Sequence, residues 1–245
     1  MEVSIWPAIR FVLFDYFRFV THRNQWHMNE NHEREKVMHR IRKFQPPVVE
    51  NRETLEQLTF TVFDLETTGF FTEFGDEIIS IGAVKMDLTG DHPPLYFYDI
   101  ICPSKSVSKQ ITGLTGLTNE KLSTAERFPS VIARFLAFID DTVLVAYPAS
   151  FDVPFLVNEL KKWKLPRVSP LYLDARKMAE DLFPGHNNDL SDWAERMNMD
   201  KDFRHHALKD ACVTSFVFEA IYSELDSRGL TLWGDLSAAW KGGTS

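Results

Sequence analysis

The strongest constraint in this sequence is a run typical of a buried strand, Phe60 to Thr68, that contains two acidic residues. Side chains in a strand alternate between its two faces, so Asp64 and Glu66 are expected to emerge on the same face. Neighbouring carboxylates repel each other unless a positive charge accompanies them. Carboxylate oxygens are ligands that Mg²⁺ and Mn²⁺ prefer, so the pair predicts a metal site. The alternative is a strand end with solvated acids, in which Thr67 to Gly69 form a turn.

Two further acids follow other predicted elements. A second strand-like run, Thr142 to Tyr147, leads into Ala-Ser-Phe-Asp, which places Asp152 at the start of a predicted helix. Later, a histidine pair, His205 and His206, precedes Asp210 where another helix is expected to begin. Taken alone, Asp152 is typical of a helix N-cap, and Asp210 is typical of a solvated helix surface.

Three motifs carry a family resemblance. Phe-Asp-Leu-Glu-Thr-Thr-Gly, Ala-Ser-Phe-Asp-Val and His-x-x-x-x-Asp occur here in this order. They resemble the exonuclease motifs of the DEDDh group, which includes the proofreading (epsilon) subunit of bacterial DNA polymerase III. The resemblance covers residues 58–225 and implies a ribonuclease H-like α/β fold, a mixed five-stranded sheet flanked by helices. In that fold the central strand carries the Asp-x-Glu pair.

The resemblance implies two divalent cations, Mg²⁺ or Mn²⁺, held by the four acids. Two metal ions about 4 Å apart activate a water and stabilise the leaving oxygen in phosphodiester cleavage. Asp64 is the expected bridging ligand, and Glu66 and Asp210 would complete the first site. Asp152 would serve the second site.

The choice of general base lies between two adjacent histidines. An imidazole is suited to accept a proton near neutral pH. Helical spacing favours His206, because four residues bring it onto the face of Asp210. The family register instead favours His205, five residues before the acid, on a loop that precedes the helix. We therefore expect His205 to be the catalytic base and His206 to belong to the first turn or the core.

Candidate substrate contacts follow from the same resemblance. Thr67, Thr68 and Phe70 come directly after the acids, where the family places the terminal nucleotide, and an aromatic ring there can stack on a base. The alternative for this segment is a hydrophobic loop packed on the core. Gln110 and Thr115 belong to a segment that resembles the one lining the nucleotide pocket.

One position departs from the family pattern. Many relatives carry His-Asn ahead of Ala-x-Phe-Asp, whereas this chain has Tyr147-Pro148. Proline removes a backbone donor and holds the preceding residue extended. The change removes a polar side chain near the expected scissile strand, so it is expected to affect substrate grip more than metal binding.

Length and charge indicate one domain with an extension. The chain has 245 residues, of which 44% are hydrophobic, enough for one sizeable core. We expect a helical extension and linker over residues 1–57 and the nuclease domain over residues 58–245. The net charge of −8 argues against a broad basic surface that coats nucleic acid. Residues 1–45 carry eight basic and five acidic side chains, so the extension has the opposite charge to the rest.

The extension contains two predicted helices. Ile5 to Val20 has apolar residues at helical spacing, and this face must pack on its own domain, a partner protein or a membrane surface. Asn29 to Phe44 is the second predicted helix, and Gln45-Pro46-Pro47 ends it. Charged residues within Val3 to Val20 exclude a membrane-spanning helix. We expect the extension to be dispensable for chemistry but needed for a partner or for solubility.

The remaining elements are predicted from periodicity. Strands are expected at Phe60–Glu66, Glu77–Met86, Leu95–Pro103 and Val143–Tyr147, with the first three forming an antiparallel meander. Helices are expected at Phe128–Asp140, Asp152–Trp163, Asp174–Leu182, Leu190–Met197 and Ala207–Asp226. Cys102 and Cys212 are far apart in sequence, which indicates free thiols in a reducing cytoplasm.

The sequence therefore predicts a metal-dependent 3′–5′ exonuclease of the DNA proofreading or repair type. It would release nucleoside 5′-monophosphates from single-stranded or frayed 3′ ends. Ribonuclease T and oligoribonuclease are similar to this architecture, so trimming of RNA is the alternative within the enzyme class. The alternative from another class is an adaptor with weak catalysis that docks on a protein partner through the N-terminal helix.

Overall fold

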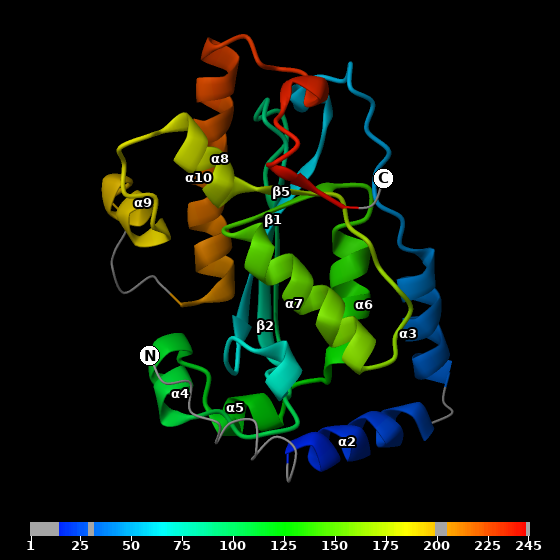
Figure 1. The fold of residues 1–245 in the computed structure, drawn as a ribbon. Coiled ribbons are helices and arrows are strands. Elements are labelled where there is room, and N and C mark those ends of the chain that lie inside the picture. Colours follow the sequence, from blue (N-terminus) through cyan, green and yellow to red (C-terminus); the bar gives the residue numbers. More distant parts are fainter. Residues whose placement is uncertain (1–14, 29–31, 199–204, 244–245) are drawn as a thin grey trace.

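The fold is built around one mixed sheet of six strands in the order β3-β2-β1-β4-β5-β6 (Figure 1). The computed structural model describes residues 15–28, 32–198 and 205–243. The strands are β1 (Phe60–Thr67), β2 (Ile78–Met86), β3 (Leu95–Ile100), β4 (Val143–Ala146), β5 (Tyr172–Asp174) and β6 (Lys241–Gly242). The predicted meander is confirmed, because β1 pairs with β2 and β2 with β3 in antiparallel fashion.

The sheet differs from the expected five strands at its far edge. β1 lies centrally and pairs in parallel with β4, which pairs in parallel with β5. The sixth strand, β6, consists of two residues near the C-terminus that pair with β5. A strand this short has no detectable alternation in sequence. The prediction of five strands was therefore wrong by one, because it lacked this edge strand.

Helices cover both faces of the sheet (Figure 1). On one face α10 (Ala207–Ser227) lies beside α8 (Ala175–Leu182) and α9 (Leu190–Arg196). On the other face lie α6 (Phe128–Phe138) and α7 (Ala149–Lys162), with α3 (His32–Lys43) and α2 (Tyr16–Met28) outside them. Two short helices, α4 (Lys109–Thr115) and α5 (Asn119–Ser123), connect β3 to α6.

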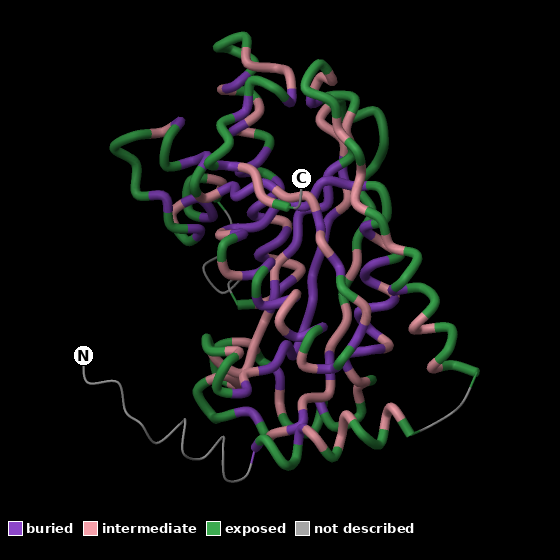
Figure 2. Tube along the Cα trace, turned by 45° about the vertical axis from the view of Figure 1, so that its right-hand side comes forward, coloured by how far each residue is buried: buried purple, intermediate pink, exposed green. Residues whose placement is uncertain are grey.

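The alternation of β1 divides the core into two layers. Phe63 and Leu65 belong to the core under α6 and α7, whereas Phe60 and Val62 belong to the core under α8 and α10. Figure 2 shows this buried centre running along the strands. Since successive side chains alternate, Asp64 shares the α10 side of the sheet with Phe60 and Val62.

The N-terminal helices pack on the sheet domain. The helix predicted over Ile5–Val20 falls mostly outside the described residues, and the described helix α2 begins at Tyr16. Phe19 of α2 and Ile41 of α3 are buried in the core that also contains Phe63. Packing on the chain's own domain, one of the expected alternatives, is therefore what the described part of the extension does. Among the described helices, none is both long and apolar enough to cross a membrane.

One glycine permits the close contact that brings α10 onto the sheet. Gly82 of β2 lies directly opposite Asp64 of β1. A Cβ atom at Gly82 would lie 2.0 Å from the backbone nitrogen of Leu208, in the first turn of α10. Only a residue without a side chain fits there. The first turn of α10, which carries Asp210, can therefore lie against the strand that pairs with Asp64.

Gly82→Ala is expected to lower the free energy of unfolding by at least about 2 kcal/mol, because the methyl group collides with backbone atoms. Gly113→Ala is the matched control: Gly113 lies in α4 with open space around its Cβ position. That control should be neutral or stabilising by up to about 1 kcal/mol. Urea unfolding of both variants measures the difference. Equal stability of the two variants would contradict the close contact.

Candidate active site

A cleft of about 270 Å³ opens at the carboxyl end of β1. Four parts of the chain that are distant in sequence line it: the end of β1 with the residues that follow it, helix α4, the start of α7 and the segment that enters α10. The residues that were predicted as site residues and that line it are Asp64, Glu66, Thr67, Phe70, Thr115, Asp152, His205 and Asp210. The fold thus brings all four acids and one histidine to a single cavity.

The two helical acids are withdrawn from water. Asp152 is 2% exposed and Asp210 is 3% exposed, whereas Asp64 and Glu66 are partly exposed. Helix α7 begins at Ala149, so Asp152 lies inside the first turn and does not occupy the N-cap, which is Pro148. The N-cap alternative for Asp152 is therefore excluded. Its carboxylate instead accepts a hydrogen bond from the backbone N–H of Leu65 in β1.

The electrostatics of the cleft favour a bound cation. Burial raises the pKa of Asp152 well above its usual range, and the negative charge of Glu66 adds to the shift. A buried carboxyl among like charges holds a proton unless a positive charge offsets them. Ligand atoms of Glu66, His205 and Asp210 all lie within 4.8 Å of one another. The two carboxylates of this group are oxygen donors that Mg²⁺ or Mn²⁺ prefers, and the imidazole of His205 lies beside them.

The two histidines occupy different environments. His205 precedes α10 in a left-handed backbone conformation (φ 63°), and its backbone N–H donates to Oδ2 of Asp210 at 3.1 Å. His205 is exposed and lines the cleft. His206 is the N-cap of α10, and its ring stacks on Tyr98 with centroids 4.5 Å apart. Burial lowers the pKa of His206.

The predicted substrate contacts divide into two groups. Thr67, Phe70 and Thr115 line the cleft, and the ring of Phe70 lies 6.0 Å from that of Phe151, centroid to centroid. Thr68 and Gln110 do not line the cleft. The hydroxyl of Thr68 donates to Asp76 at 3.0 Å, within the loop that follows β1, and Gln110 is exposed on α4.

Sequence reasoning missed several apolar residues of the cleft wall. Ile111 and Leu114 project from α4, and Phe151 directly precedes Asp152 on α7. The three-residue spacing of Ile111 and Leu114, next to Thr115, was the available signal. Tyr147 also lines the cleft, but its hydroxyl donates to the backbone carbonyl of Asn188. Burial raises the pKa of Tyr147 to about 12. Because its hydroxyl is bonded to Asn188, Tyr147 offers the cleft an aromatic surface.

Known proteins are similar to this chain over most of its length. The family model described as Exonuclease (RNase_T) matches residues 61–218. DNA polymerase III subunit epsilon from Treponema pallidum is 36% identical over 166 residues, which cover 66% of this chain and 76% of that protein. DNA polymerase III PolC-type from Thermotoga maritima is 34% identical over 194 residues, or 76% of this chain. The chain spans only 14% of that second relative.

A solved structure shows the same fold. The nuclease domain of 3′hExo, a DEDDh family member bound to rAMP, superposes with a TM-score of 0.59 at 21% identity. The superposition covers 71% of this chain and 94% of that domain. The family match extends over more than half of the chain and includes nearly all of β1, the whole of α7 and most of α10. The chain therefore belongs to the exonuclease (RNase_T) family.

Proposed function

We propose that this chain is a metal-dependent 3′–5′ exonuclease that removes nucleoside 5′-monophosphates from single-stranded or frayed 3′ ends of DNA. The observation that carries the proposal is the convergence of four carboxylates and His205 on one cleft. Ligand atoms from β1, α10 and the segment before α10 approach within 4.8 Å of one another there. Membership of the exonuclease family supports the reaction class.

The reaction is hydrolysis of the last phosphodiester bond. The oxygen of a water molecule bonds to phosphorus, the bond from phosphorus to the 3′ oxygen breaks, and that oxygen takes up a proton. The products are a nucleoside 5′-monophosphate and a strand one nucleotide shorter with a free 3′ hydroxyl. Two divalent cations held by Asp64, Glu66, Asp152 and Asp210 would supply Lewis acidity for the attacking and leaving oxygens.

The protein's own groups have separate tasks in this proposal. The imidazole of His205 accepts the proton that the attacking water loses, since its position before α10 leaves the ring at the cleft. The backbone N–H of His205 is bonded to Asp210, which ties the base to an expected metal ligand. Phe70 and Leu114 offer apolar surface for the terminal base, and both are exposed in this structure.

DNA is the proposed substrate because the relatives at 34–36% identity are DNA polymerase III proteins by name. The solved structure of 3′hExo contains rAMP, so a ribonucleotide fits the same fold. The 2′ hydroxyl is the group that separates RNA from DNA. The preference for DNA or RNA is therefore tested by comparing the degradation of the two.

The direct test is degradation of a matched pair of 5′-labelled DNA and RNA oligonucleotides with Mg²⁺, with Mn²⁺ and with chelator. We expect the DNA strand to shorten from its 3′ end in a ladder that disappears with chelator and in Asp64→Ala. Faster shortening of the RNA strand would replace DNA by RNA in the proposal. Absence of a ladder with either metal would contradict the enzyme and leave the adaptor alternative.

A second test separates the two histidines. His205→Ala is expected to lower kcat by about 10²- to 10⁴-fold, because it removes the proton acceptor at the cleft. His206→Ala is the matched neighbouring variant. It should retain most of the activity, because the ring of His206 stacks on Tyr98 and does not line the cleft. Single-turnover rates with a DNA substrate measure both. Loss of turnover in His206→Ala with normal turnover in His205→Ala would reverse the assignment.

A further inference from the structure

The loop that borders the cleft carries three phenylalanines, and polar contacts hold its base. This aromatic loop comprises residues 68–77, between β1 and β2, and its rings Phe70, Phe71 and Phe74 are 76%, 55% and 42% exposed. The ring of Phe70 contacts Phe151 and that of Phe71 contacts Phe74, but all three rings remain exposed, so little buried packing fixes this loop. Its position therefore depends on the hydrogen bonds and ion pairs at its base.

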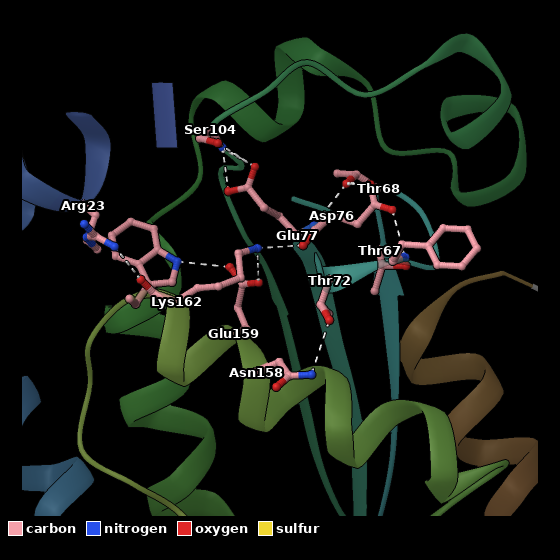
Figure 3. A network of polar contacts seen from close by, with 12 residues as sticks. Arg23, Thr67, Thr68, Thr72, Asp76, Glu77, Ser104, Asn158, Glu159 and Lys162 are labelled. Atoms are coloured by element: carbon pink, nitrogen blue, oxygen red, sulfur yellow. Dashed lines mark hydrogen bonds and ion pairs between the residues drawn. The ribbon is translucent and has the colours of Figure 1, made fainter. Parts of the chain in front are cut away.

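Asp76 makes most of the contacts that close the aromatic loop (Figure 3). Its Oδ2 accepts from the backbone N–H of Phe71 at 3.0 Å, and its Oδ1 accepts from the hydroxyl of Thr68 at 3.0 Å. Lys105 forms an ion pair with the same carboxylate at 2.8 Å. A Cβ at Gly69 would lie 2.3 Å from Oδ2, so the glycine allows the chain to fold directly over the carboxylate.

Lys162, at the end of α7, supports this arrangement from the opposite side (Figure 3). Its ammonium donates to the backbone carbonyl of Asp76 at 2.7 Å and to Oε2 of the buried Glu159 at 2.9 Å. One turn earlier on α7, Asn158 donates to the hydroxyl of Thr72 at 3.3 Å. The aromatic loop is thus fastened to the same helix that carries Asp152.

The N-terminal helix α2 covers the other side of Lys162. The ammonium of Lys162 lies 5.0 Å from the centre of the Phe19 ring, within the range of a cation–π contact. Arg23 of α2 donates to the backbone carbonyl of Lys162 at 3.1 Å. The ring of Phe19 also packs edge to face on Trp163, with centroids 5.4 Å apart. Lys162 therefore lies between the extension and the base of the aromatic loop.

We propose that Lys162 is a positioning residue for the 3′-terminal nucleotide, which holds the aromatic loop through Asp76 and is itself held by Phe19 of the N-terminal helix. The proposal rests on the proposed exonuclease function of the cleft. Phe70 is the link to the cleft, since it belongs both to the loop and to the cleft wall. A displaced loop would weaken binding of the terminal nucleotide without altering the acids or His205. The extension would then take part in substrate binding.

The test compares Glu159→Gln with the double variant Glu159→Gln, Lys162→Met. The single variant removes the carboxylate of Glu159, so loss of Lys162 in the double variant leaves no unpaired charge at position 159. Relative to the single variant, we expect KM for a single-stranded DNA to rise about three- to tenfold, with kcat within twofold. Lys161→Met, at an exposed lysine in the same turn, is the control and should leave both constants unchanged.

Hydrogen exchange supplies a readout that is independent of activity. The Phe71 amide donates to Asp76, so exchange of residues 68–77 should be faster in the double variant than in Glu159→Gln. Lys105→Met, which removes the ion pair of the Asp76 carboxylate, should accelerate the same amides. Unchanged exchange, or faster exchange without a rise in KM, would overturn the proposal. An inactive wild-type protein would contradict the proposed function, while the exchange result still decides whether Lys162 holds the loop.

A second pair of variants tests the part played by α2. Phe19→Leu keeps an apolar side chain but removes the ring beside Lys162, so both KM and the exchange of residues 68–77 should rise. Phe17→Leu is the matched control, because Phe17 is 65% exposed on the same helix. If Phe19→Leu behaves as Phe17→Leu does, the extension takes no part in positioning the loop.

Discussion

Repulsion between carboxylates is the main electrostatic constraint on this cleft. Asp152 and Asp210 are almost fully buried, and Asp64 and Glu66 emerge beside them from one strand. Burial alone disfavours the charged form of Asp152, and the charge of Glu66 disfavours it further. Such a cluster is stable in one of two ways: it retains protons, or it holds cations that offset its charge. The second way links the stability of the site to its chemistry.

The fold brings these charges together by means that are largely independent of them. β1 lies centrally between β2 and β4, so its carboxyl end is surrounded by the starts of α7 and α10. Gly82 allows α10 to approach β2 opposite Asp64. The backbone N–H of Leu65 donates a hydrogen bond to the carboxylate of Asp152. On the outer side, α2 and α7 support the aromatic loop through Lys162. The acids are thus positioned by backbone contacts, and the loop is positioned by its own backbone hydrogen bonds together with the side chains of Asp76 and Lys162.

Local sequence patterns predicted the parts of the structure that local physics determines. The period of two in β1 placed Asp64 and Glu66 on one face, and periodicity located the helices near their observed bounds. Helical spacing alone favoured His206, but α10 begins at Ala207 as predicted, so both histidines precede the helix and the four-residue spacing does not decide between them. The pairing of β6 with β5 and the contacts of Lys162 with Asp76 and Phe19 join residues that are distant in sequence. No periodic pattern records such contacts, and neither was predicted.

Crystals grown with Mn²⁺ and a nucleoside 5′-monophosphate would test the metal site most directly, through the anomalous scattering of manganese. The account predicts a manganese peak within about 2.0–2.3 Å of carboxylate oxygens of Asp64, Glu66 and Asp210, with a second peak beside Asp152. The same peaks should be absent from Asp64→Ala. Manganese bound only at other positions, or a nucleotide-filled cleft without a peak, would contradict the account.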